Sequence, residues 1–94
     1  MNVRVEFAGQ LQTATGRAND LIELPEGSTV AMLLSELGQR YGDPARPHLF
    51  GAAGQVQSSL LVAINGTALS SRQAGAIVLR QEDTILLLPP IAGG

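Results

Sequence analysis

The end of the sequence combines a reactive group with an unusual lack of side chains. The last residues are Pro89, Pro90, Ile91, Ala92, Gly93 and Gly94. Glycine has no Cβ, so two consecutive glycines can enter a channel that is too narrow for other residues. The two prolines fix φ and favour an extended chain. Because six extended residues span roughly 20 Å, the carboxylate of Gly94 is predicted to reach the active site of another protein and to react there.

This ending predicts a flexible tail over residues 89–94, in which Gly94 carries the reacting carboxylate. The five residues before Gly94 are predicted to bind along the partner's channel. The groups that perform the chemistry would then belong to the partner.

Few other residues could support catalysis. His48 is the only histidine, and a metal site needs several converging ligands, so a packed or exposed loop residue is its expected role. The chain has no cysteine, and its serines lack a plausible histidine–carboxylate pair. Glu82 and Asp83 are adjacent in a predicted turn and are expected to be solvated. We therefore predict no metal site and no catalytic activity for the chain alone.

Composition restricts the partners. The chain has 94 residues, a net charge of −2 and six basic residues, all of them scattered arginines, so no basic stripe is available for nucleic acid. The absence of lysine means that no side chain can receive an isopeptide bond. No apolar run is long enough to span a membrane and the first residues lack a signal pattern, so a cytoplasmic location without membrane partners is expected.

Hydrophobic periodicity predicts the elements that must position the tail. Apolar residues alternate in the first segment and take a helical spacing in the middle of the chain. Strands are predicted over residues 3–7, 20–24, 60–64 and 84–88, and a helix over 29–41. The connections are predicted to include a hairpin connection over 9–19, a tight turn at Asn65-Gly66, and a short strand or packing segment over 76–79. Ser28 or Thr29 is placed to cap the helix.

This order predicts one α+β domain over residues 1–94 with a β-grasp fold, in which one main helix packs across a mixed sheet. The last strand would pair beside the first, so the tail would leave from the centre of the sheet. Within the apolar run 85–88, Leu87 points opposite to its neighbours. Leu87 is therefore predicted to belong to an apolar face that contacts a partner.

The chain resembles the MoaD/ThiS-type ubiquitin-like sulfur carriers over nearly its whole length. The resemblance is carried by LPEGSTV at 24–30, VAING at 62–66, EDTI at 82–85 and the Pro-Pro-x-x-Gly-Gly ending. That ending is similar to the branch formed by the small subunit of molybdopterin synthase. Two features differ from that branch: Gln81-Glu82-Asp83 replaces the usual Asp-Gly-Asp turn, and no bulky aromatic residue precedes the prolines.

The resemblance implies a sulfur carrier. A ubiquitin-activating-like enzyme would use ATP and magnesium to adenylate Gly94, and a cysteine desulfurase or rhodanese would supply the sulfur of a thiocarboxylate. The large subunit of molybdopterin synthase would then receive that sulfur for molybdenum cofactor synthesis, and the carrier would hold no stable cofactor. The alternatives are a carrier for tRNA thiolation, thiamine or cysteine synthesis, and a ubiquitin-like modifier conjugated through Gly94.

Overall fold

The order of elements follows the predicted change from strand to helical periodicity and back. The computed structural model describes residues 1–90. Its elements are β1 (Asn2–Phe7), α1 (Gln10–Thr15), β2 (Asn19–Glu23), α2 (Val30–Tyr41), α3 (Arg46–Leu49), β3 (Leu61–Ile64), β4 (Thr67–Ser70), α4 (Ser71–Ala74) and β5 (Thr84–Leu88).

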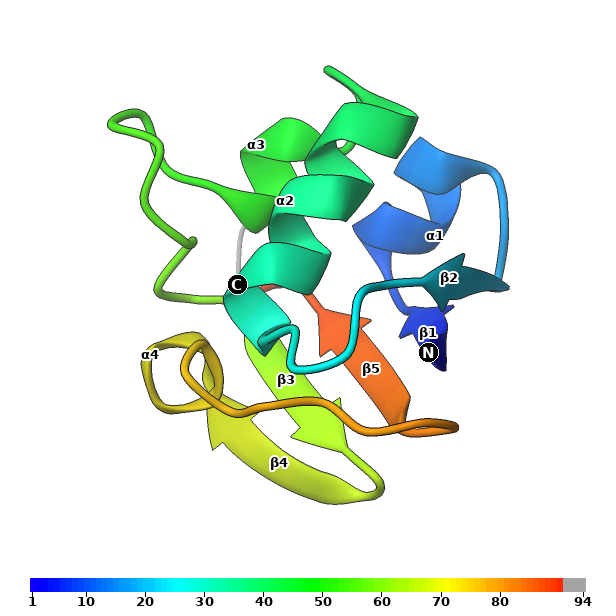
Figure 1. Cartoon of the computed structure of the whole chain (residues 1–94). Coiled ribbons are helices and arrows are strands. Elements are labelled where there is room, and N and C mark those ends of the chain that lie inside the picture. The colour runs from blue at the N-terminus through cyan, green and yellow to red at the C-terminus, as the bar shows by residue number, and fades with distance from the viewer. Residues whose placement is uncertain (91–94) are drawn as a thin grey trace.

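The five strands form one mixed sheet in the order β2-β1-β5-β3-β4. β5 runs parallel to β1 and antiparallel to β3, while the two hairpins β1–β2 and β3–β4 are antiparallel. The last strand therefore lies at the centre of the sheet beside the first strand, which confirms the predicted arrangement. α2 lies across one face of this sheet (Figure 1).

α2 begins and ends where local chemistry requires it. The Thr29 side chain accepts a hydrogen bond from the Met32 amide at 3.3 Å, which is an N-cap interaction. The amides of Val30 and Ala31, which have no acceptor within the helix, donate to the backbone carbonyls of Ile77 and Gly75 in the segment that follows α4. At the other end Gly42 has φ 69°, a conformation that favours glycine. The predicted helix is confirmed, and Thr29 is its cap.

The apolar face of α2 fills the core against the sheet. Its buried residues include Val30, Leu33, Leu34 and Leu37. Facing them are Val3 and the other inward residues of β1, together with residues of β2, β3 and β5. Helical spacing on one side and period-two spacing on the other thus produce two complementary apolar surfaces.

Three connections differ from the predictions. The segment 9–19 joins two antiparallel strands as expected, but it contains α1, whose Leu11 is fully buried. The loop around His48 contains α3. The fourth strand is β4, which starts immediately after the Asn65-Gly66 turn, and not the segment 76–79.

The physical reason for the last difference is the turn itself. Asn65 and Gly66 have φ of 50° and 90°, so the chain reverses within two residues and pairs again at once. The segment 76–79 is instead the packing alternative, because Leu79 is buried while Val78 makes only an isolated bridge to Thr29.

Candidate functional site: the end of β5 and the surfaces beside it

The tail leaves the sheet from a strand that is paired on both sides. Leu87 lies opposite Phe7 of β1, and Leu88 lies opposite Leu61 of β3. The Ala8 amide donates to the Leu87 carbonyl at 3.1 Å, which extends the β1–β5 ladder by one bond. The direction in which the chain leaves the sheet is therefore fixed by two neighbouring strands.

The two prolines of the predicted tail differ in their surroundings. Pro89 is buried, whereas Pro90 is exposed. The flexible tail predicted over 89–94 thus needs correction at its first residue, because a buried ring is part of the folded body. The other predicted tail residues, Ile91, Ala92, Gly93 and the reactive Gly94, lie outside the described residues.

Leu87 does not form a partner surface. Its side chain is fully buried on the face that α2 covers, together with Ile85 of the same strand. The prediction was wrong because the side chains of β5 alternate, and the register with β1 and β3 places Leu87 opposite the inward-facing Phe7 and Val62. The residues of β5 that face away from the core are Leu86 and Leu88.

An apolar area lies on the sheet face opposite α2, and we call it the outer patch. Its members are Leu61, Ala63, Ala68, Leu86 and Leu88. Leu61 and Leu88 are 40% and 36% exposed. The patch borders the polar part of the same face, where Arg4 and Glu6 form an ion pair at 3.8 Å. It therefore places an exposed apolar surface directly beside the start of the tail.

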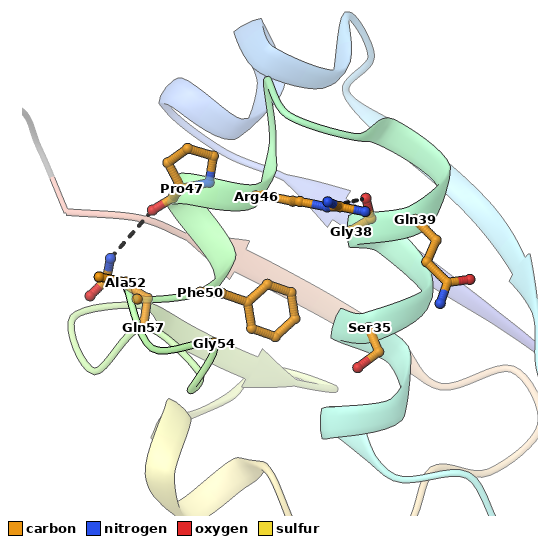
Figure 2. Close-up of a pocket in the computed structure, with 10 residues that line it drawn as sticks. Ser35, Gly38, Gln39, Arg46, Pro47, Phe50, Ala52, Gly54 and Gln57 are labelled. Carbon is orange, nitrogen blue, oxygen red and sulfur yellow. Dashed lines mark hydrogen bonds between the residues drawn. The ribbon is translucent and has the colours of Figure 1, made fainter.

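A groove of about 720 Å³ lies between α2, α3 and the loop after α3 (Figure 2). Arg46 crosses it and donates from Nε to the Gly38 carbonyl at 3.1 Å. The Phe50 ring lies against Gly38, where an added Cβ would be 3.2 Å from ring carbon Cε2. On the loop side, Gln57 donates to the Pro47 carbonyl at 3.3 Å. The lining is mainly amide, aromatic and backbone, so it offers contacts for binding and no acid–base pair.

No pattern in the sequence predicts this groove. It depends on α3 packing over a single glycine of α2, and an isolated Gly38 inside a helical pattern predicts only a weaker helix. His48 lies in α3 and is half-buried. Within residues 1–90, no three histidine, cysteine, aspartate or glutamate side chains meet in a cluster that could hold a metal ion.

A polar cluster ties β2 to the end of α2. Tyr41 donates a hydrogen bond to Asp20, and Arg17 and Arg40 lie 3.1 and 3.5 Å from the same carboxylate. Burial raises the pKa of Asp20, but the Tyr41 hydrogen bond and the Arg17 charge more than offset it, so its pKa lies below the ordinary value. Burial and the hydrogen bond to Asp20 raise the pKa of Tyr41. The cluster therefore favours a charged Asp20 and a neutral Tyr41, which suits a structural role.

A second polar cluster fixes the start of β5. Asp83 accepts hydrogen bonds from the Asn65 side chain at 2.9 Å and from the Arg80 amide at 2.8 Å. The Asn65 side-chain oxygen accepts from the Thr84 amide at 2.9 Å. Glu82 is exposed and has φ 68°. These two carboxylates therefore do not form an acid–base pair, and the role of Asp83 is to join the β3–β4 turn to β5.

None of the helices in the described part of the chain is both long and apolar enough to span a membrane. The candidate binding surfaces in the described part of the chain are the end of β5, the outer patch, and the groove between α2 and α3.

Solved structures of other proteins share the fold described above. SAMP1 from Haloferax volcanii has a TM-score of 0.86 at 21% identity, with both chains covered completely. SAMP1 from Methanosarcina acetivorans has a TM-score of 0.80 at 25% identity, covering 99% of this chain and 96% of that one. A putative molybdopterin converting factor, subunit 1, from Pyrococcus furiosus has a TM-score of 0.75 at 24% identity, covering 97% and 99%. These likenesses confirm the β-grasp fold.

A search of curated proteins found no significant match. The model of the ThiS family matches residues 5–94, which is nearly the whole chain. Members of this family are small ubiquitin-like carriers that act with an adenylating enzyme and a sulfurtransferase, and they are not themselves catalysts. The chain therefore belongs to the ThiS family of ubiquitin-like sulfur carriers.

Proposed function

We propose that this chain carries sulfur as a thiocarboxylate on Gly94 and donates it in molybdopterin synthesis, as the small subunit of molybdopterin synthase. The observation that carries the proposal is the central position of β5, whose last paired residue, Leu88, directly precedes the Pro-Pro-x-x-Gly-Gly sequence and belongs to an exposed apolar patch. The likeness to the putative molybdopterin converting factor subunit of Pyrococcus furiosus supports the choice of pathway.

The proposed activation has two balanced steps. The Gly94 carboxylate attacks the α-phosphorus of ATP and releases pyrophosphate, which gives an acyl adenylate. In the second step, the terminal sulfur of a persulfide on a donor such as a cysteine desulfurase or rhodanese attacks the acyl carbon and displaces AMP. A thiol then reduces the resulting acyl disulfide to the thiocarboxylate and is itself oxidised to a disulfide with the donor's cysteine. The adenylating partner uses the ATP and magnesium, and this chain contributes the carboxylate and its delivery.

Two surfaces of the chain would cooperate in delivery. The outer patch would dock against the partner, and the four residues between the buried Pro89 and Gly94 would guide the carboxylate along the channel. Because Leu88, the last paired residue of β5, is itself a member of the patch, docking of the patch fixes the origin of the tail relative to the partner's channel. The large synthase subunit would then take the sulfur for transfer to a pterin acceptor.

A second function is favoured by a separate observation. The two SAMP1 structures are named for a small archaeal modifier protein, and one of them has the TM-score of 0.86. A modifier would use the same adenylation but would end as an isopeptide on another protein's lysine. Since this chain has no lysine, it would act only as the donor in such a bond.

Intact-mass measurement after incubation with the adenylating enzyme, ATP, magnesium and a sulfur donor tests the proposal. We expect a gain equal to the difference between one sulfur and one oxygen atom, located on Gly94. Deleting Gly94, or adding one residue after it, removes the reacting group without touching the sheet and is the control. Recovery of the protein only as isopeptide conjugates, and never as a thioacid, would replace the carrier with the modifier.

A further inference from the structure

The end of β5 contains two prolines of the same chemistry in different environments. Pro89 is buried and Pro90 is exposed, although they are adjacent. Proline has no amide hydrogen, so neither residue can extend the ladder with a donated bond. Pro89 therefore donates no backbone hydrogen bond to the sheet, although its ring is buried.

The residues just before Pro89 are held from both sides. The Leu87 carbonyl accepts from the Ala8 amide at 3.1 Å, and Leu88 pairs with Leu61. The chain just after β1 also lies close to Leu88: a Cβ added at Gly9 would be 3.9 Å from Leu88 Cδ1, which is an ordinary van der Waals contact. With φ fixed by its ring, a buried Pro89 leaves little freedom to the point at which the chain departs.

We infer that Pro89 is a positioning residue, which fixes the origin of the tail and thereby sets the reach of the Gly94 carboxylate. This inference rests on the proposed function. Five residues after Pro89 reach about 17 Å when extended, against roughly 20 Å if the tail began at Pro89 itself. An end group on a tether reacts best when the tether matches the span, and a longer or looser tether lowers its effective concentration. Pro89 thus acts through the position of Gly94 and does not itself touch the reacting atoms.

The test compares Pro89→Gly with Pro90→Gly as a matched pair. Both replace one proline by glycine in the same tail, but only the first removes a buried ring. ATP–pyrophosphate exchange is measured with the adenylating enzyme at varied carrier concentration. We expect Pro89→Gly to lower kcat about five- to tenfold, because one more residue becomes free to rotate. KM should change less than twofold, because the outer patch still docks, and Pro90→Gly should stay within about twofold of the unmodified chain in both constants.

Two further measurements separate positioning from loss of structure. Pro89→Val keeps an apolar side chain at the buried position and should recover most of the kcat. Hydrogen exchange at the Ala8 amide, which bonds to Leu87, should accelerate in Pro89→Gly and not in Pro90→Gly. If Pro89→Gly melts at a much lower temperature, Pro89→Ala and Pro90→Ala are compared for the same difference in kcat, because alanine also removes most of the buried ring but frees the backbone less than glycine does.

The outcomes are distinguishable. Equal kcat for the two glycine variants, or for the two alanine variants where the glycine pair cannot be compared, overturns the inference and leaves the proposed function standing. A rise in KM with kcat unchanged would also overturn it, since Pro89 would then belong to the docking surface. Failure of the unmodified chain to support any exchange would overturn the proposed function, and the inference with it.

Discussion

The two faces of β5 use the same kind of residue for different purposes. Leu87 is fully buried beneath α2, whereas its neighbour Leu88 is 36% exposed on the outer patch. The side chains are identical and the residues are adjacent, so residue type explains none of the difference. The comparison shows that strand parity, set by which face the helix covers, separates a residue that stabilises the fold from one that is available to a partner.

The two faces also differ in what surrounds them. The inner face is closed by α2 and by residues of α1 and α3, which leave Ile85 and Leu87 no exposed surface. On the outer face, the apolar area ends at the ion pair between Arg4 and Glu6. A polar border around an exposed apolar area is typical of an interaction surface.

The largest effect is expected from the inner face. Leu87→Ala should lower the free energy of unfolding by about 2–5 kcal/mol, because it leaves a cavity in a closed core. Leu86→Ala, one residue away on the outer face, is the matched control and should cost about 1 kcal/mol or less. Urea denaturation followed by circular dichroism measures both values. Equal losses for the two variants would contradict the assignment of the faces.

A smaller effect, on binding and not on stability, is expected from the outer face. Leu88→Asp should weaken binding to the adenylating enzyme at least tenfold, about 1.4 kcal/mol, because a charge would enter an apolar interface. Leu21→Asp is the control, since Leu21 is 67% exposed on the same face but lies on β2, outside the patch. Isothermal titration calorimetry gives the affinities. If Leu21→Asp weakens binding as much as Leu88→Asp does, the patch is not the docking surface.

The smallest effect concerns the polar link between the sheet and α2. Tyr41→Phe removes the hydrogen bond to Asp20 and should cost about 1 kcal/mol near neutral pH. The pKa of folded Asp20 lies below its unfolded value of about 3.9, so its charge stabilises the protein above that pH and the contribution is lost as the pH falls through the folded pKa.

The gap in unfolding free energy between Tyr41→Phe and the unmodified chain should therefore narrow below about pH 4, where the carboxylate becomes protonated. Urea denaturation at a series of pH values from neutral to acid measures it. A gap that stays constant through this range would contradict a charged Asp20 as the acceptor, and Glu6→Gln provides a control for an exposed carboxylate on the outer face.

The sequence alone determined the elements with strong periodicity and strong local chemistry. The helical spacing from Val30 to Tyr41, its Thr29 cap and the Asn65-Gly66 turn each have a local physical cause, so they could be predicted without the fold. The order of strands and helix then led to the central β5. The sequence also pointed to Gly94 as the reacting residue, which stays a prediction.

Only the tertiary structure decided which side chains of β5 face the core and how far along the chain the burial extends. Residues 85–88 are apolar at every position, so alternation carries no signal, and the choice between Leu87 and Leu88 depends on pairing with β1 and β3 beneath α2. The burial of Pro89 likewise arises from surrounding elements and not from its own type. α1 and α3 are short helices that local propensity specifies weakly, and they are stabilised by Leu11 and Leu49 in the core.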